Sequence, residues 1–163
     1  MVDTHIFNKG DKIVYPMYGA GIIEELEEKQ TDGATEVYYI LNIPITNLKI
    51  KVSASKAQIL GIREVYAKDK VMEILNGTDF PEEATSQNWN QRYKENLEKI
   101  KSGKLTEAIT VFKSLLGREK LRALSSAEKK MLTTARQIIV SEIMISQNTG
   151  KDEAETILLD ALA

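Results

Sequence analysis

The sequence predicts an α+β protein, with a small β-barrel over residues 1–63 followed by an all-α helical domain over residues 64–163. Two observations support this division. The first part contains short apolar runs separated by glycine, proline and turn sequences, a pattern typical of strands. In the second part, apolar residues recur at the three- and four-residue spacing of helices. The chain has 163 residues, of which 42% are hydrophobic, and can bury a core in one medium domain or two small ones.

The β region is expected to contain four or five short strands, in "KIVYPMYGAGIIEEL", "TEVYYILNI" and "NLKIKVS". In the last segment Leu48, Ile50 and Val52 alternate with polar residues, which places the aliphatic side chains on one face. The triplet "TDG" at residues 31–33 predicts a turn between two strands, because glycine readily adopts positive φ. Strands this short bury little surface in an open sheet, so we expect them to curl into a barrel.

The helical region is expected to contain successive helices separated by glycines and polar segments. The first is predicted to end at Gly77, the second at Gly103 and the third at Gly117, since glycine commonly follows the last turn of a helix. Ser125 and Glu128 have the spacing of a capping box and are expected to begin a long fourth helix. A last helix is predicted in "TGKDEAETILLDALA".

The charges are segregated along the chain. The formal net charge is only −2, but residues 89–136 contain 12 lysines and arginines against five aspartates and glutamates. A basic block inside an acidic protein is typical of a surface that binds nucleic acid. Solvated helix faces would give the same count, so charge by itself leaves both interpretations open.

Few residues in the sequence are suited to catalysis or metal binding. His5 is the only histidine, there is no cysteine, and Gly19-Ala20-Gly21 lacks the other glycines of a phosphate-binding loop. The acidic run at residues 24–28 would be split between the two faces of a strand. We therefore expect no enzyme activity, no cofactor and no metal site. No apolar run is long enough for a bilayer span and no secretory signal is visible, which favours a cytoplasmic protein.

Trp89 is the only tryptophan, and it lies among amides and bases in "QNWNQRYKEN". Tyr93 and Leu97 follow it at helical spacing, which favours a core position. Its predicted place in the first turn of a helix favours the opposite, because a side chain near a helix end keeps one ring edge accessible. The sequence is therefore compatible with Trp89 in the core and with Trp89 partly exposed at the helix end.

Several segments along almost the whole chain carry a resemblance to a known family. In the β region they are "FNKGDKIVYPMYGAGII", "YYIL", "LKIKV" and "GIREV". In the helical region they are "NWNQRYKENLEKIKSGKLTEAITVFKSLL", "LSSAEKKMLTTARQIIVSEI" and "AETILLDAL". Together they resemble the CarD/CdnL family of bacterial transcription regulators. The resemblance implies a Tudor/SH3-like barrel that binds the β subunit of RNA polymerase, and a helical domain that reaches promoter DNA at the upstream edge of the transcription bubble.

The resemblance also implies roles for particular residues. A tryptophan matching Trp89 is the wedge placed in the minor groove, with Arg92 and Lys94 as positive charges beside it. Gln91 occupies a position that is basic in some relatives. Lys29 and Lys51 fall where relatives carry basic residues that engage the polymerase, and lysine keeps the charge of arginine but lacks its planar fork. The implied activity is non-enzymatic stabilisation of the open promoter complex by a monomer with weak sequence specificity.

Two other functions remain as alternatives. In the first, the chain is a protein-binding adaptor whose basic block docks acidic partners without direct DNA contact. In the second, it is a sequence-specific repressor, which requires a recognition helix and usually a symmetric dimer.

Overall fold

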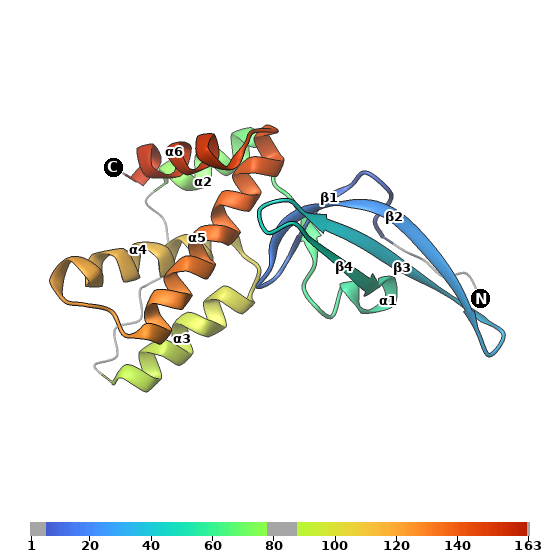
Figure 1. Ribbon diagram of the computed structural model, residues 1–163, viewed down its shortest axis with the longest axis horizontal. Helices are drawn as coiled ribbons and strands as arrows, with labels where there is room; N and C mark the ends of the chain where they lie inside the picture. Colours follow the sequence, from blue (N-terminus) through green and yellow to red (C-terminus); the bar gives the residue numbers. More distant parts are fainter. Residues whose placement is uncertain (1–5, 78–87, 163) are drawn as a thin grey trace.

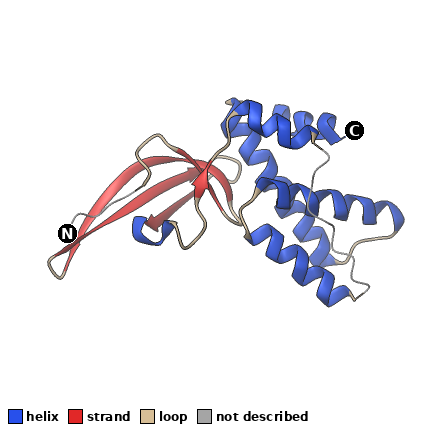
Figure 2. Cartoon of the chain, turned by 180° about the vertical axis from the view of Figure 1, so that it is seen from behind, coloured by secondary structure: helices blue, strands red, loops and turns tan. Residues whose placement is uncertain are grey.

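The structure is a computed structural model that describes residues 6–77 and 88–162. Strands dominate the first part and helices the second, and the two occupy opposite ends of the molecule (Figure 1, Figure 2). The predicted α+β class is therefore confirmed. In chain order the elements are β1 (Lys12–Tyr15), β2 (Gly19–Thr31), β3 (Ala34–Ile43), β4 (Leu48–Ser53), α1 (Ala54–Ala57), β5 (Arg63–Glu64), α2 (Lys68–Asn76), α3 (Trp89–Lys101), α4 (Leu105–Leu121), α5 (Ser126–Gln147) and α6 (Lys151–Leu162).

The predicted barrel takes the form of a curved antiparallel sheet with the strand order β4-β3-β2-β1-β5. The long β2–β3 hairpin turns at Asp32 and Gly33, whose φ angles of 50° and 79° are those of a two-residue type I′ turn. The predicted turn is thus confirmed. A register shift between Ile23 and Glu25 marks a bulge, which bends β2 and increases its twist. One face of the sheet is buried; its core includes Ile13, Ile23, Tyr39, Leu41, Ile43 and Val52.

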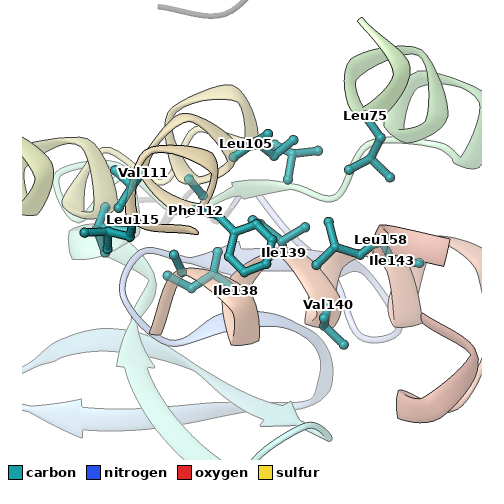
Figure 3. Close-up of a cluster of buried hydrophobic side chains, with 14 of the residues drawn as sticks. Leu75, Leu105, Val111, Phe112, Leu115, Ile138, Ile139, Val140, Ile143 and Leu158 are labelled. Carbon is teal, nitrogen blue, oxygen red and sulfur yellow. The ribbon is translucent and has the colours of Figure 1, made fainter. Parts of the chain in front are cut away.

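Helix α5 is the centre of the helical part. Its residues Ala135, Ile139 and Ile143 are fully buried, and helices α2, α3, α4 and α6 all pack against it. Figure 3 shows the resulting cluster, in which Phe112 of α4 lies beside Ile139. The capping box predicted at the start of α5 is present: the Ser125 hydroxyl accepts from the Glu128 N–H at 3.1 Å, and the Glu128 carboxylate accepts in return from the Ser125 N–H at 3.4 Å.

The predicted end of the third helix at Gly117 is wrong. Helix α4 continues through this residue to Leu121. Gly117 is exposed, and the residues that follow it are good helix formers, so the helix tolerates the glycine at a cost of about 1 kcal/mol relative to alanine. Gly103 does end α3 as predicted, with a φ of 75°.

Buried polar groups join the sheet to α5. The Ser141 hydroxyl accepts the backbone N–H of Ala20 at 2.8 Å and donates to the Ile138 carbonyl at 2.7 Å. Gly19 adopts a φ of 113°, and a Cβ at this position would lie 2.6 Å from the Ser141 hydroxyl. Strand β2 therefore approaches α5 as closely as glycine allows.

An ion pair completes this junction. Arg63 of β5 donates to both carboxylate oxygens of Glu142, at 2.9 and 2.7 Å, and Glu142 is fully buried. The same carboxylate accepts the N–H of Tyr66 at 3.0 Å, and Arg63 Nε donates to the Gly103 carbonyl at 2.8 Å. Because one arginine contacts α5 and the α3–α4 connection together, the sheet and the helices are held in a defined relative orientation.

Candidate functional site

The first turn of α3 presents Trp89. The Asn88 side chain caps the helix by accepting from the backbone N–H groups of Asn90, at 2.9 Å, and Gln91, at 3.3 Å. Trp89 follows the cap directly and is 40% exposed, with its ring centroid 5.3 Å from that of Tyr93. The indole therefore packs on Tyr93 with part of its surface and presents the remainder to solvent.

Exposed cations lie on the same helix. Lys94 and Lys101 are seven residues apart in α3, so they lie on one face, and both are exposed. Lys130 of α5 is exposed too, and it lines a hollow together with Tyr93 and Leu97 of α3. We refer to Lys94, Lys101 and Lys130 as the cationic surface. Gln91 is also exposed, and its side-chain amide donates to Glu95 at 3.2 Å, one helical turn away.

Arg92 is in a different position from the one predicted. It is only 6% exposed, and its Nε lies 3.7 Å from a carboxylate oxygen of Glu128. Arg118 Nε lies 3.8 Å from the same oxygen. Arg92 thus connects α3 to the start of α5 and is not a cation exposed beside the indole. Local sequence patterns could not reveal this contact, because Glu128 is distant from Arg92 along the chain.

Lys29 and Lys51 lie on the same outer face of the sheet, on the non-adjacent strands β2 and β4. Lys29 pairs with Glu36 across β2 and β3, while Lys51 of β4 lies 3.0 Å from Glu27 of β2. The Lys51 ammonium also lies 4.9 Å from the centre of the Tyr38 ring, within cation–π range. Both predicted lysines therefore lie on one exposed face, but Lys51 is already engaged by a carboxylate of its own chain.

Hydrogen bonds fix the charge of Glu36 on this face. The Ser53 hydroxyl donates to its Oε1 at 2.8 Å and the Tyr38 hydroxyl to its Oε2 at 3.0 Å. These two bonds, that from Ser53 first, lower the pKa of Glu36 below its ordinary value, because they favour the ionised form. The bond to Glu36 raises the pKa of Tyr38 for the corresponding reason. The outer face therefore carries an ionised Glu36 across from Lys29 in the β2–β3 pairing.

Sequence reasoning did not identify the residues of the junction. Glu142 is far along the chain from its partner Arg63, and their pairing depends on how β5 meets α5. One signal was available. The pair Ser141-Glu142 interrupts the apolar run "IIVSEIMI" on the central helix, and a carboxylate on such a face needs a buried partner.

Within residues 6–77 and 88–162 there is no group of three or more acidic or histidine side chains arranged to hold a metal ion. No helix in these ranges is both long enough and apolar enough to cross a membrane. His5, the only histidine, lies outside the described residues.

Comparison with known proteins gives matches over nearly the whole chain. Residues 7–66 match the family model described as the CarD-like/TRCF RID domain, and residues 70–159 match the one described as the CarD C-terminal domain. A relative from Bacillus subtilis (strain 168), "Putative transcription factor YdeB", is 37% identical over 140 residues, which cover 86% of this chain and 92% of the relative. The first matched range ends at residue 66, between β5 and α2, and the second begins at residue 70, in the first turn of α2.

Proposed function

The chain belongs to the CarD family of transcription factors, and on this basis we propose that it is a non-enzymatic regulator of transcription initiation that binds RNA polymerase and promoter DNA together. The sheet domain binds the polymerase β subunit. The helical domain binds DNA at the upstream edge of the bubble and stabilises the open complex. The observation that carries the proposal is the position of Trp89, which is partly exposed and lies on the same helix as two exposed lysines.

Trp89 acts as a wedge in this proposal. Apolar side chains inserted between base steps in the minor groove must offset an unstacking cost of a few kcal/mol per step. At a bubble edge part of this cost has already been met, because the neighbouring pairs are open. A wedge that fits the melted junction binds the open state better than the closed one, and this difference shifts the equilibrium.

The cationic surface supplies attraction to phosphates without reading sequence. If Lys94, Lys101 and Lys130 each contact a phosphate, the logarithm of the duplex affinity falls with the logarithm of salt concentration with a slope of about −3. Arg92 is left out of this set because its charge is buried against Glu128. Gln91 contributes a polar contact only.

The sheet domain anchors the protein as a monomer on the polymerase, and through it to the nucleoid in the cytoplasm. Lys29 and Lys51 present positive charge on the outer face for acidic side chains of the β subunit. Weak DNA binding becomes effective when the second domain is tethered, because a short linkage gives an effective concentration of order mM. The buried Arg63–Glu142 pair supports this tethering, since it holds the two domains in one orientation.

The substitution Trp89→Ala tests the proposal. We expect the lifetime of the open complex to fall about tenfold, which corresponds to losing about 1.4 kcal/mol of preference for the open state. Binding to polymerase core should stay at the wild-type level. A suitable control is Leu121→Ala, which removes another exposed apolar side chain of the helical domain. Unchanged promoter opening in Trp89→Ala would refute the wedge.

A second experiment separates this function from that of a protein-binding adaptor. Because Trp89 is the only tryptophan, its fluorescence reports directly on the candidate site. We expect a salt-sensitive change in fluorescence when fork-junction DNA is added. An adaptor without DNA contact predicts no change.

A further inference from the structure

A half-open hollow of about 110 Å3 lies next to the Trp89–Tyr93 pair. Tyr93 and Leu97 of α3 form one wall, and Thr134 of α5 belongs to the other. The hollow is much larger than the space that one water molecule occupies. Its remaining lining residues are Met17, Ile100, Lys130 and Met131.

Met17 reaches the hollow from the sheet domain. It lies in the β1–β2 turn, is 37% exposed and has a φ of 76°, in the left-handed region that a residue with a side chain rarely adopts. Such a conformation persists where the surroundings fix it, and residues in this region cluster at functional sites. Here the neighbouring Pro16 is packed against the α3–α4 connection, since a Cβ on Gly103 would lie 2.8 Å from its ring.

The chemistry of the hollow favours a flat, apolar group that carries negative charge at its edge. Ile100 and Met131 are buried, which makes an apolar floor, while Tyr93 adds an aromatic surface and Met17 a thioether. Lys130 belongs to the lining, and Lys94 and Lys101 are on the exposed face of the same α3. A nucleobase with its phosphates matches both features, because bases stack on aromatic side chains and phosphates pair with lysine. A purely apolar protein segment would leave the lysines without a role.

We propose that this hollow receives one unpaired nucleobase of single-stranded DNA, next to the base pairs that Trp89 contacts. The inference rests on the proposed function, because it requires α3 to face DNA at the edge of a bubble. Closed duplex DNA has no unpaired base to offer, whereas an open junction does. The hollow therefore adds to the preference for open DNA independently of the wedge.

The test compares two fork-junction DNAs that differ at one position. In the first, the unpaired nucleotide next to the junction carries its base; in the second, it is abasic. The affinity of the full-length protein for each is measured by fluorescence anisotropy of labelled DNA. We expect wild-type protein to bind the base-containing fork about fivefold or more tightly than the abasic fork, the range expected for stacking one base.

Two neighbouring threonines provide a matched pair of variants. The hydroxyls of Thr133 and Thr134 each donate to the carbonyl four residues earlier, at 3.1 and 3.0 Å, but only Thr134 lines this hollow. Thr134→Phe should fill the hollow. The ratio of the affinities for the base-containing and abasic forks should then fall to near one, with the affinity for duplex DNA unchanged. Thr133→Phe should keep the wild-type preference. Met17→Ala, which changes the hollow from the other domain, should also lower the preference, and thermal unfolding verifies that each variant is folded.

The possible results distinguish base binding by the hollow from the proposed DNA-binding function on which it rests. If wild-type protein binds the two forks equally and Trp89→Ala still weakens binding to both, the hollow does not bind a base. The proposed role of Trp89 as a wedge would stand. A base preference that survives in both Thr134→Phe and Met17→Ala would also overturn it. Equal fork binding combined with weaker polymerase binding by Thr134→Phe would assign the hollow to a polymerase segment instead. Failure of wild-type protein to bind any fork would overturn the proposed DNA function itself.

Discussion

At the scale of single residues, the partner of each charge decides whether it is available to a ligand. Arg92 and Lys94 are two positions apart in a basic segment, yet one is buried near Glu128 and the other is exposed. Lys51 is intermediate, since it is half exposed but held 3.0 Å from Glu27. Any acidic partner of Lys51 must compete with this carboxylate, so the internal pair weakens the contact and makes it selective.

This competition predicts the effect of Glu27→Gln. The substitution frees Lys51, and we expect polymerase core to bind about two- to fivefold more tightly, as expected for an exposed ion pair worth up to about 1 kcal/mol. Binding is measured at several salt concentrations, and the gain should shrink as salt increases. Glu25→Gln removes the same charge from the same strand but affects an ion pair with Lys9, so it serves as the control. If the two substitutions increased the affinity equally, the gain would come from the change in net charge and not from release of Lys51.

At the scale of elements, Glu128 connects three helices. As the third residue of α5 it completes the capping box, and its carboxylate also lies near Arg92 of α3 and Arg118 of α4. The charge and the cap are separable, because glutamine also serves at this position of a capping box.

Glu128→Gln is therefore expected to keep the cap and lose the charge. A buried arginine left without its counter-charge destabilises a protein by about 3 kcal/mol, so the free energy of unfolding should fall by roughly that amount. Ser125→Ala, which removes the cap and leaves the carboxylate, should cost about 1 kcal/mol. Chemical denaturation measures both. If Ser125→Ala were the more damaging change, the cap and not the ion pair would be the main contribution of Glu128.

At the scale of the whole molecule, the junction between sheet and helices sets where the two proposed binding surfaces lie relative to each other. Figure 1 shows α5 running from the helical bundle to the sheet, where Ser141 and Glu142 meet strand β2 and Arg63. A rigid connection matters here, because a tether adds affinity only if both sites engage at once.

Glu142→Gln tests this connection. It removes the charge that holds Arg63 and should lower the free energy of unfolding by about 3 kcal/mol. We also expect a shorter open-complex lifetime, although Trp89, the cationic surface and the outer sheet face are untouched. Fluorescence energy transfer between labels on the two domains should show a broader distance distribution. A variant that is destabilised but retains a narrow distribution and a normal lifetime would show that the pair serves stability alone.

Local patterns predicted much of the fold. The alternation in residues 48–52 gave a strand, "TDG" gave the turn at Asp32 and Gly33, and the spacing of Ser125 and Glu128 gave the start of α5. The order of the domains followed from the change in the spacing of apolar residues, from strand-like to helical. The helix end predicted at Gly117 was wrong, since a glycine on the exposed side of a helix resembles a glycine that ends one.

The sequence by itself determined the two domains, the position of Trp89 at a helix start and the basic block, because each depends on neighbours within a few residues. Only the tertiary structure decided that Arg92 is buried, that Lys51 is held by Glu27, and that Met17 meets Tyr93 in one hollow. The physical reason is that burial and electrostatic pairing depend on distances in space, which packing sets between residues far apart in the chain.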